Sequence, residues 1–406
     1  MNMVVGIIAE YNPFHNGHRY QIEQIRQRVK NATIVVVMSG NFTQRGEPAI
    51  LDKFTRAALA VNGGCDLVLE LPFVSAVRSA QDFARGGINL LKNLGIVDVL
   101  AFSSEVDDIE LLQQAAKLMN DTDFKRNLHD KLDNGISYAN AICQTLSKLI
   151  NINEKILCLP NVILAIEYLR ALEATEIIPL LIPRVAASHN DKVLYSNISS
   201  ATSIRASIYS QNPAWNDISK NVDSKTLNEL KITDLPIMEN LFRPLITKIV
   251  CSTTSELREI YGMNEGLENK FIQAAHSTQN LDEFINFIVS RRYTRSRVQR
   301  LLLHLLIGLT RKQVNIFDDI HYARILAFNQ RGRELIKEIK KSSQIPIITK
   351  ITRHITSRAI YEKSNIFNLY QKKLSLDIIS SNIFSIIHQK IKLEKEFTTS
   401  PIFYPN

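Results

Sequence analysis

Two histidines at a predicted strand-to-helix turn have the residue type and spacing for phosphate chemistry. His15 and His18 lie within Glu10-Tyr11-Asn12-Pro13-Phe14-His15-Asn16-Gly17-His18, after an apolar run and before a helical pattern. A helix start favours an anion because its N–H groups are unpaired and its dipole is positive there, and Gly17 lets a ligand approach the backbone. Both imidazoles can reach one phosphate and stabilise charge on a pentacoordinate phosphorus or on departing pyrophosphate. The pattern indicates a site for the α-phosphate of a nucleotide.

Two other interpretations of these histidines stay open on the residues alone. The spacing also suits a pair of zinc ligands, and two histidines can serve a purely structural role in a turn. The four cysteines add no metal pattern because none forms a Cys-x-x-Cys pair. We therefore expect buried free thiols at Cys65, Cys143, Cys158 and Cys251 rather than disulfides or a zinc knuckle, and we assign no residue as a metal ligand.

Short β-branched runs alternate with amphipathic segments of helix length in the first part of the chain. The expected strands cover residues 4–9, 34–38, 66–71, 99–102 and 180–185. The expected helices cover residues 16–30, 52–62, 80–94, 108–119 and 162–174. Such alternation predicts an α/β fold with a parallel sheet between helices, whose ligands lie at the carboxyl ends of the strands.

Longer helical periodicities dominate after about residue 241. The clearest cover residues 281–289, 296–310 and 321–339. We therefore expect a nucleotide-binding α/β domain over residues 1–205, a connecting region over 206–240 and a separate, mainly α-helical domain over 241–406.

Charge is distributed unevenly along the chain. The net charge is +9 overall, but residues 1–240 hold 23 basic and 26 acidic side chains, whereas residues 241–406 hold 26 basic and 14 acidic ones. A basic surface of that size attracts polyanions through counterion release, so nucleic acid is the expected partner ahead of an anionic membrane. A solvated basic face without a partner is the remaining alternative.

Neither a membrane span nor an export signal is evident. A membrane helix needs about 20 apolar residues, and the most apolar stretch, 301–309, is short and interrupted by His304 and Gly308. The first nine residues lack the basic region and cleavage site of a signal peptide. We expect a cytoplasmic protein without membrane contact, and nothing in the sequence implies a stable protein partner.

The run from Glu10 to His18 resembles the His-x-Gly-His signature of the nucleotidylyltransferase superfamily. Further segments follow it in order: Ser-Gly-Asn-Phe-Thr-Gln-Arg-Gly-Glu-Pro at 39–48, Asp52-Lys53 with Arg56, Asp-Leu-Val-Leu-Glu-Leu-Pro-Phe at 66–73 and Arg-Arg-Tyr-Thr-Arg at 291–295. Taken together, they resemble the bacterial tRNA(Met) cytidine acetate ligase family over most of the chain. Asp52 and Arg56 share a helix face, which suits an ion pair, and we expect no catalytic role for them.

This resemblance implies a Rossmann-like, parallel-sheet nucleotidylyltransferase domain followed by a basic helical domain that binds tRNA. It implies that acetate and ATP, with Mg²⁺, give acetyl-adenylate at His15 and His18, the expected catalytic residues. The acetyl group then passes to N4 of the wobble cytidine of elongator tRNA(Met), a base that is already single-stranded and cheap to extrude.

ATP contacts are implied for residues in several segments. They are Ile7, Ile8, Ala9, Glu10, Tyr11, Asn12, Pro13, Phe14, His15, Asn16, Gly17, His18, Ser103, Asn161, Arg184, Thr202, Ser203 and Arg205. Ser103 stands where the family usually has a glycine, Val162 stands where it often has a second asparagine, and residues 185–189 replace a Gly-rich stretch. Asn161 at a helix start is equally explained as an N-cap.

Arginines cluster at the start of a predicted helix whose apolar stripe begins at Val298. Cations there oppose the helix dipole, so phosphates are expected to offset them. The expected tRNA-binding residues are Arg291, Arg292, Tyr293, Arg295, Arg297, Lys350 and Arg353. In this interpretation Tyr293 stacks on an unpaired base while the cations follow the RNA backbone.

Two other functions are consistent with parts of this pattern. An adenylyltransferase acting on a small phosphorylated cofactor precursor would share the histidine turn but would have no use for the basic domain. A non-catalytic tRNA-binding protein with a relic nucleotide fold would use the basic domain alone.

Overall fold

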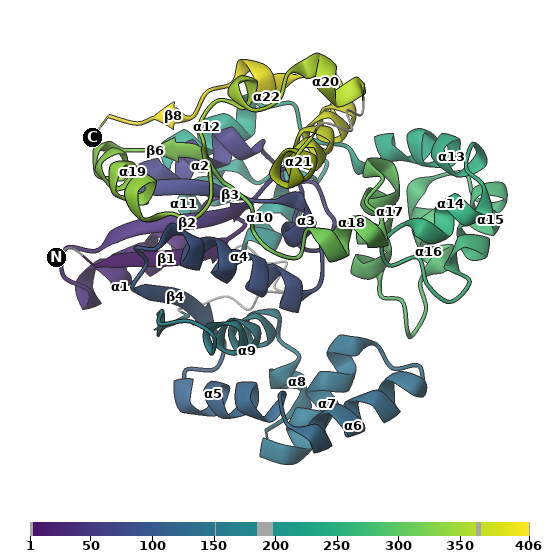
Figure 1. Cartoon of the computed structure of the whole chain (residues 1–406), viewed down its shortest axis with the longest axis horizontal. Helices are drawn as coiled ribbons and strands as arrows, with labels where there is room; N and C mark the ends of the chain where they lie inside the picture. Colours follow the sequence, from purple (N-terminus) through teal and green to yellow (C-terminus); the bar gives the residue numbers. More distant parts are fainter. Residues whose placement is uncertain (1–2, 151, 185–197, 363–366, 406) are drawn as a thin grey trace.

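The computed structural model describes residues 3–150, 152–184, 198–362 and 367–405, which form a sheet flanked by helices (Figure 1). The strands are β1 (Val4–Ala9), β2 (Thr33–Ser39), β3 (Leu67–Leu71), β4 (Val99–Ser104), β5 (Ile178–Pro183), β6 (Ala323–Phe328), β7 (Ile347–Ile348) and β8 (Ile402–Phe403). Their order is β5-β4-β1-β2-β3-β6-β7, with β8 beside β6. Strands β1 to β5 pair in parallel, which confirms the parallel sheet expected from the sequence.

Helices cover both faces of this sheet because its central strands are apolar on both sides. Every residue of β2 is buried, and its side chains alternate between the faces. Val35 packs in the core with α4 (Ala80–Leu94), whereas Val36 packs in the core with α1 (Asn16–Arg28). The sheet therefore presents its strand ends, rather than a face, to ligands.

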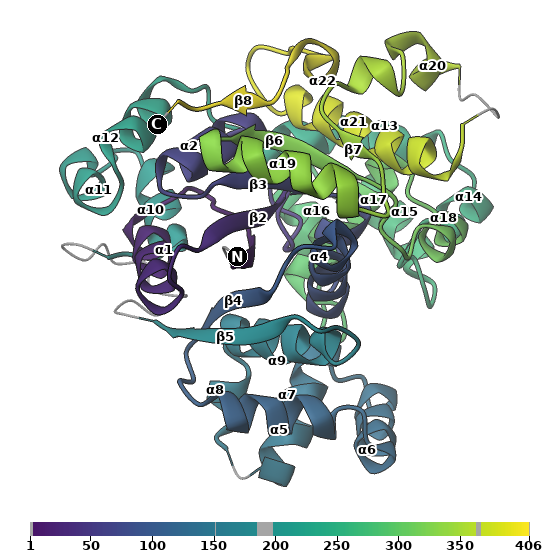
Figure 2. The same ribbon diagram turned by 60° about the vertical axis from the view of Figure 1, so that its left-hand side comes forward.

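A helical group lies between β4 and β5 and stands below the sheet in Figure 2. Its helices are α5 (Ile109–Leu118), α6 (Thr122–Asp133), α7 (Tyr138–Ile150), α8 (Glu154–Leu157) and α9 (Pro160–Leu172). Cys143 of α7 is disulfide-bonded to Cys158, which contradicts the expectation of four free thiols. The spacing of 15 residues hid the pair, because the chain between the two cysteines turns back on itself. Cys65 is free and buried, and Cys251 is free but exposed.

Residues 206–240 are more than a connection. They contain the end of α10 (Ala201–Ile208), α11 (Trp215–Asn221) and α12 (Ser224–Ile232). Ile218 and Leu230 belong to the same core as α1, and Arg19 of α1 pairs with Asp223 at 3.1 Å. This segment is part of the nucleotide-binding domain.

A compact helical unit with its own core follows, at the right of Figure 1. It comprises η1 (Met238–Leu241), α13 (Phe242–Val250), α14 (Thr254–Glu259), α15 (Leu267–Ser277), α16 (Leu281–Ile288) and α17 (Arg295–Ile307), and α18 (Arg311–Ile316) leads out of it. Phe271 and Phe284 pack edge to face at its centre, 5.5 Å apart. The expected helices at 281–289 and 296–310 correspond to α16 and α17.

The prediction of a separate helical domain reaching residue 406 is wrong. Residues 321–339 are not one helix but β6 followed by α19 (Gln330–Ser342), and Asn329 caps that helix by accepting from Gly332 N at 2.9 Å. Strand β6 pairs with β3 in antiparallel orientation, so the chain returns to the sheet. The other elements of this segment are η2 (Ile351–Arg353), α20 (Ser357–Tyr361), α21 (Leu369–Ile386) and α22 (Lys395–Thr398). Two helices of the first domain, α2 (Lys53–Asn62) and α3 (Phe73–Ala76), flank β3 along the chain.

This return also changes where the positive charge lies. Residues 242–307 hold 9 basic and 6 acidic side chains, whereas residues 308–406 hold 17 and 8. Most of the basic excess therefore lies outside the helical unit. None of the helices in the described part of the chain has the length and apolar character that a membrane crossing needs.

Buried ion pairs fasten the C-terminal segment to the first domain. Arg324 of β6 pairs with Glu70 of β3 at 3.0 Å and also with Glu396 of α22. Lys53 of α2 bonds to the same two carboxylates, each at 2.6 Å. All four side chains are at most 2% exposed, so each charge depends on the others for solvation.

Replacing Arg324 by Leu is expected to lower the free energy of unfolding by about 3–5 kcal/mol, because Glu70 and Glu396 would share Lys53 as their remaining cation. Urea unfolding of the whole chain measures the change. The matched control is Arg358→Leu, since Arg358 also pairs with a glutamate, Glu362, but is 88% exposed. That variant should lose less than about 1 kcal/mol, and equal losses would contradict the special role of the buried pairs.

Candidate active site

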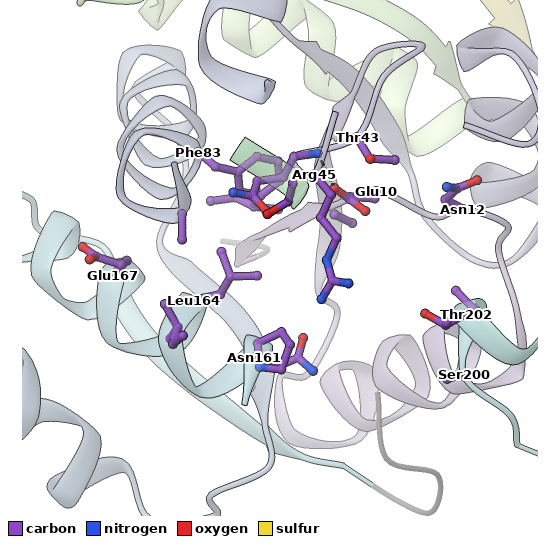
Figure 3. A pocket seen from close by; sticks show the side chains of 18 of the residues that line it. Glu10, Asn12, Thr43, Arg45, Phe83, Asn161, Leu164, Glu167, Ser200 and Thr202 are labelled. Carbon is purple, nitrogen blue, oxygen red and sulfur yellow. Dashed lines mark hydrogen bonds between the residues drawn. The ribbon is translucent and has the colours of Figure 1, made fainter. Parts of the chain in front are cut away.

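A cavity of 860 Å³ lies at the carboxyl ends of β1 and β4 and extends to α17. Its lining comes from the turn after β1, the loop after β2, the starts of α4, α9 and α10, and the arginines of α17. Figure 3 shows Asn12, Ser200 and Thr202 at one end and Phe83, Leu164 and Glu167 at the other. The cavity therefore joins the nucleotide turn to the basic helix.

The histidine turn is held by its own backbone. His15 caps α1, with its Nδ1 accepting from Gly17 N at 3.0 Å, and His18 Nδ1 accepts from His15 N at 3.2 Å. The two rings stack with centroids 3.8 Å apart. An Nδ1 atom that accepts a hydrogen bond carries no proton, so each neutral ring carries its proton on Nε2.

Both imidazoles are neutral at physiological pH. Burial, followed by Arg184 and Arg205, lowers the pKa of His15 to about 3. Burial, followed by His15 and Arg184, lowers the pKa of His18 well below its ordinary value. The turn thus offers two Nε2–H donors to an anion, and the positive charge of the site comes from arginine.

This geometry predicts the tautomers of the free protein. In ¹⁵N NMR at pH 6, His15 and His18 should both show the Nε2–H form, because burial lowers the pKa of His15 to about 3 and that of His18 well below its ordinary value. A protonated Nδ1 on either ring, or an imidazolium signal at pH 6, would contradict the hydrogen bonds described above.

Only part of the predicted ATP-binding run reaches the cavity. Ile8, Ala9, Glu10, Tyr11, Asn12, His15, Gly17 and His18 line it. Ile7 and Phe14 are buried in the core, and the Asn16 side chain donates to Lys220 O at 2.8 Å. Pro13, which follows a cis peptide bond, is also outside the lining. These four side chains build the turn instead of lining the cavity, and ATP contacts at their positions stay a prediction.

At the start of α10 the structure separates two neighbouring hydroxyls. Thr202 lines the cavity, but Ser203 is fully buried and its Oγ donates to Ser200 O at 2.8 Å. The Ser203 hydroxyl thus completes the helix cap, which does not favour the predicted phosphate contact. Arg205 lines the cavity and donates to Asn12 O at 2.6 Å, which ties this helix to the histidine turn.

Ser103, Asn161 and Arg184, three of the residues expected to contact ATP, all line the cavity. Asn161 is not an N-cap, because α9 begins at Pro160 and its cap is Leu159; the Asn161 side chain donates to Glu105 Oε1 at 2.6 Å. Val162 is fully buried, so a second asparagine at that position would not face the cavity. Residues 185–189, which replace the Gly-rich stretch, lie outside the described residues.

The loop after β2 was missed as part of the site, although its sequence carried the resemblance. Thr43, Gln44, Arg45 and Glu47 line the cavity. Gly46 has φ +80°, and a Cβ there would lie 2.6 Å from the backbone N of Arg300, so the loop packs directly on α17. The sequence feature that could have indicated this loop is the Arg-Gly pair after a buried strand. No local pattern, however, places that pair against α17, whose Arg300 comes 256 residues after Gln44.

Part of the predicted arginine set lines the cavity. Arg292, just before α17, and Arg295 and Arg297 of α17 do so, together with Arg300, which was not predicted. Arg292 also pairs with Glu265, and Arg295 with Asp282, both exposed carboxylates. Arg291 is outside the lining, and Lys350 and Arg353 lie at η2, next to α22 and away from the cavity.

Tyr293 does not stack on a ligand in this structure. Its side chain is buried, its hydroxyl donates to Glu265 Oε2 at 2.5 Å, and Arg297 lies over its ring at 4.5 Å. The ring belongs to the core of the helical unit and packs against Arg297, which does not favour the predicted stacking on a base.

Within the described residues, no group of three His, Cys, Asp or Glu side chains is arranged to hold a metal ion. His15 and His18 thus lack further protein ligands of a zinc site in that part of the chain. Asp52 and Arg56 do not pair either: Asp52 caps α2, and the buried Arg56 donates to Leu51 O at 3.0 Å and Ser39 O at 3.1 Å.

Comparisons with known proteins extend over the whole chain. The model of the HIGH Nucleotidyl Transferase family matches residues 1–398. A protein of Acetivibrio thermocellus named tRNA(Met) cytidine acetate ligase is 37% identical, with 98% of this chain and 99% of that protein covered. A Clostridium perfringens protein of the same name is 36% identical, with 99% of each covered.

Solved structures show the same likeness. The crystal structure of Thermotoga maritima TmcAL without ligand matches with a TM-score of 0.89 at 32% identity, covering 100% of both chains. The structure of the same protein bound with alpha-thio ATP matches with a TM-score of 0.87 at 31% identity, again covering 100% of both chains.

Proposed function

Since this chain belongs to the tRNA(Met) cytidine acetate ligase family of HIGH nucleotidyl transferases, we propose that it uses ATP to join acetate to N4 of the wobble cytidine of elongator tRNA(Met). The relative that binds alpha-thio ATP supports ATP as the co-substrate. The observation that carries the proposal is the continuity of one cavity from His15 and His18 to the arginines of α17. A nucleotide and an RNA base can therefore bind next to each other in this one cavity.

In the first step, an acetate oxygen attacks the α-phosphorus of ATP. The two Nε2–H groups donate to the phosphate oxygens on which negative charge grows, and they need no proton transfer to do so. Arg184, Arg205 and the start of α10 lie beside this turn and suit the outer phosphates. A Mg²⁺ ion that arrives with ATP would supply charge neutralisation for the departing pyrophosphate, and an ion bound through phosphates would need no cage of protein ligands.

In the second step, the cytidine amine attacks the carbonyl carbon of acetyl-adenylate, and AMP leaves. The arginines of α17 line the same cavity and suit the phosphates of the anticodon loop that delivers the base. Keeping both steps in one cavity protects the mixed anhydride from water.

The proposal is tested by mass spectrometry of nucleosides from tRNA(Met) incubated with this protein, ATP and acetate. We expect N4-acetylcytidine at the wobble position, together with AMP formation that requires acetate. Omission of acetate is the control and should abolish both products. A stable AMP-containing dinucleotide would support a cofactor adenylyltransferase and overturn the proposal, as would tRNA binding without any acetylation.

A further inference from the structure

We propose that Glu10 is the general base that takes the proton from the cytidine amine during acetyl transfer. The inference rests on the function proposed above and adds a residue role to its second step. It starts from the position of this carboxylate between the nucleotide turn and the RNA-facing helix.

Glu10 follows β1 directly and lines the same cavity as His15 and His18. Its Oε1 accepts from Gln44 N at 2.7 Å, which fixes the carboxylate, while its Oε2 makes no hydrogen bond to any described residue. Figure 3 shows Glu10 beside Arg45, across the cavity from Asn161. One oxygen is thus anchored and the other is left for a ligand.

The loop that anchors Glu10 also contacts the basic helix. Gln44 donates through its N–H to Glu10, and its carbonyl oxygen accepts from Arg300 of α17 at 3.3 Å. Gly46 packs against the α17 backbone at a distance that leaves no room for a side chain. The loop 43–47 therefore links the Glu10 carboxylate to α17 through Gln44.

Charged groups around Glu10 come from every neighbouring element. Arg45 of the loop, Arg56 of α2 and Arg205 of α10 favour its anionic form, and Gln44 N bonds to it, but burial outweighs them and raises its pKa. The phenol of Tyr168 on α9 faces it as well, and its pKa is raised by burial and by Glu10. A carboxylate with a raised pKa is a stronger base than a solvated one, and the three arginines favour its anionic form.

Other groups in the cavity are poorly placed for this task. The histidines are already protonated on Nε2 and use Nδ1 for backbone hydrogen bonds, so neither accepts a proton readily. Glu167 has Oε2 bound to Arg170 at 2.8 Å. Glu47 also lines the cavity, and Glu167 Oε1 has no hydrogen bond among the described residues. Glu10 is distinguished from both because it directly follows β1, next to the histidine turn, and Gln44 N fixes its carboxylate.

The step balances as follows. A bond forms between N4 of cytidine and the acetyl carbon, and the bond from that carbon to the phosphate oxygen breaks, with its electron pair leaving on AMP. The proton lost by N4 moves to Glu10 Oε2 and is later released to water.

Glu10→Gln tests this role because the amide oxygen can still accept from Gln44 N. We expect acetate-dependent ATP–pyrophosphate exchange to stay within about threefold of the unmodified protein, while single-turnover transfer to tRNA falls by about 10²-fold or more. The rate of transfer by the unmodified protein should rise with pH and then level off as Glu10 ionises. This rising part of the pH–rate profile should be absent in Glu10→Gln. Glu10→Asp, which keeps a carboxylate, should restore part of the transfer rate and the rise of that rate with pH.

Exposed Glu110 of α5 provides the control variant, Glu110→Gln, which should change neither step. Loss of exchange and transfer to the same extent in Glu10→Gln would assign Glu10 to ATP binding and overturn the proposal. So would normal transfer in Glu10→Gln, or a selective loss of transfer in Glu167→Gln instead. If the unmodified protein showed no acetate-dependent ATP–pyrophosphate exchange, the proposed function itself would be contradicted, whatever the Glu10 variants do.

Discussion

Replacing His18 by Asn is expected to slow acetate-dependent ATP–pyrophosphate exchange by about 10²–10³-fold, the usual effect of removing one preorganised donor to developing charge. The Asn amide oxygen can take over from Nδ1 as acceptor for His15 N, so the turn should keep its fold. What disappears is the Nε2–H donor. Affinity for ATP, measured by calorimetry, should fall by less than about tenfold because the arginines remain.

A substitution of His15 would be harder to interpret, because it changes the stability of α1 as well as the site. The His15 side chain caps α1, so His15→Ala would remove a cap worth about 1 kcal/mol as well as a donor. His129→Ala on α6 is the matched control, since that imidazole is exposed on the helical group between β4 and β5 and is outside the cavity lining. Unchanged exchange in His18→Asn would contradict the donor role, and a complete loss of ATP binding would assign His18 to affinity rather than to the chemical step.

The nucleotide half of the site could be predicted from sequence because its information is local. Strand, turn and helix start follow one another within 15 residues around His15, and the alternation of apolar runs indicated the parallel strands. The fold of this part and the lining by His18, Ser103, Asn161 and Thr202 were therefore expected.

The parts that were missed depend on contacts between distant segments. Strand β6 reads as part of a helix because its short apolar run merges with the amphipathic pattern of α19, and only pairing with β3 makes it a strand. Ser203 and Tyr293 have residue types that suit ligands, but one completes a helix cap and the other bonds to Glu265. The loop 43–47 acquires its role from packing on α17, and a hydrophobic pattern in the sequence does not predict such a contact.

Neutralising the cavity-facing arginines of the helical unit tests the second half of the site. The triple variant Arg292→Gln, Arg295→Gln and Arg297→Gln is expected to weaken tRNA(Met) binding by about 10²-fold at low salt. Glutamine is preferred to glutamate because Arg292 and Arg295 lie beside Glu265 and Asp282, where a new carboxylate would add repulsion. Loss of those exposed pairs costs at most about 1 kcal/mol each, so the unit should stay folded.

Salt dependence separates phosphate contacts from a general loss of structure. Each contact with single-stranded RNA contributes roughly 0.7 to the slope of log affinity against log salt, so three lost contacts should reduce that slope by about 2. Exchange of pyrophosphate into ATP should be unchanged, because His15, His18 and Arg205 are untouched.

Arg300 is left out of the triple variant because it anchors Gln44 and the loop beside Glu10. The matched control replaces Lys337, Lys340 and Lys341 of α19 by Gln, which removes the same charge from an exposed helix outside the cavity lining. If binding depended only on net charge, both triples would weaken it equally. The continuity of the cavity instead predicts that only the triple variant at Arg292, Arg295 and Arg297 loses tRNA. Equal losses would show that the RNA follows the C-terminal segment, where most of the basic excess lies.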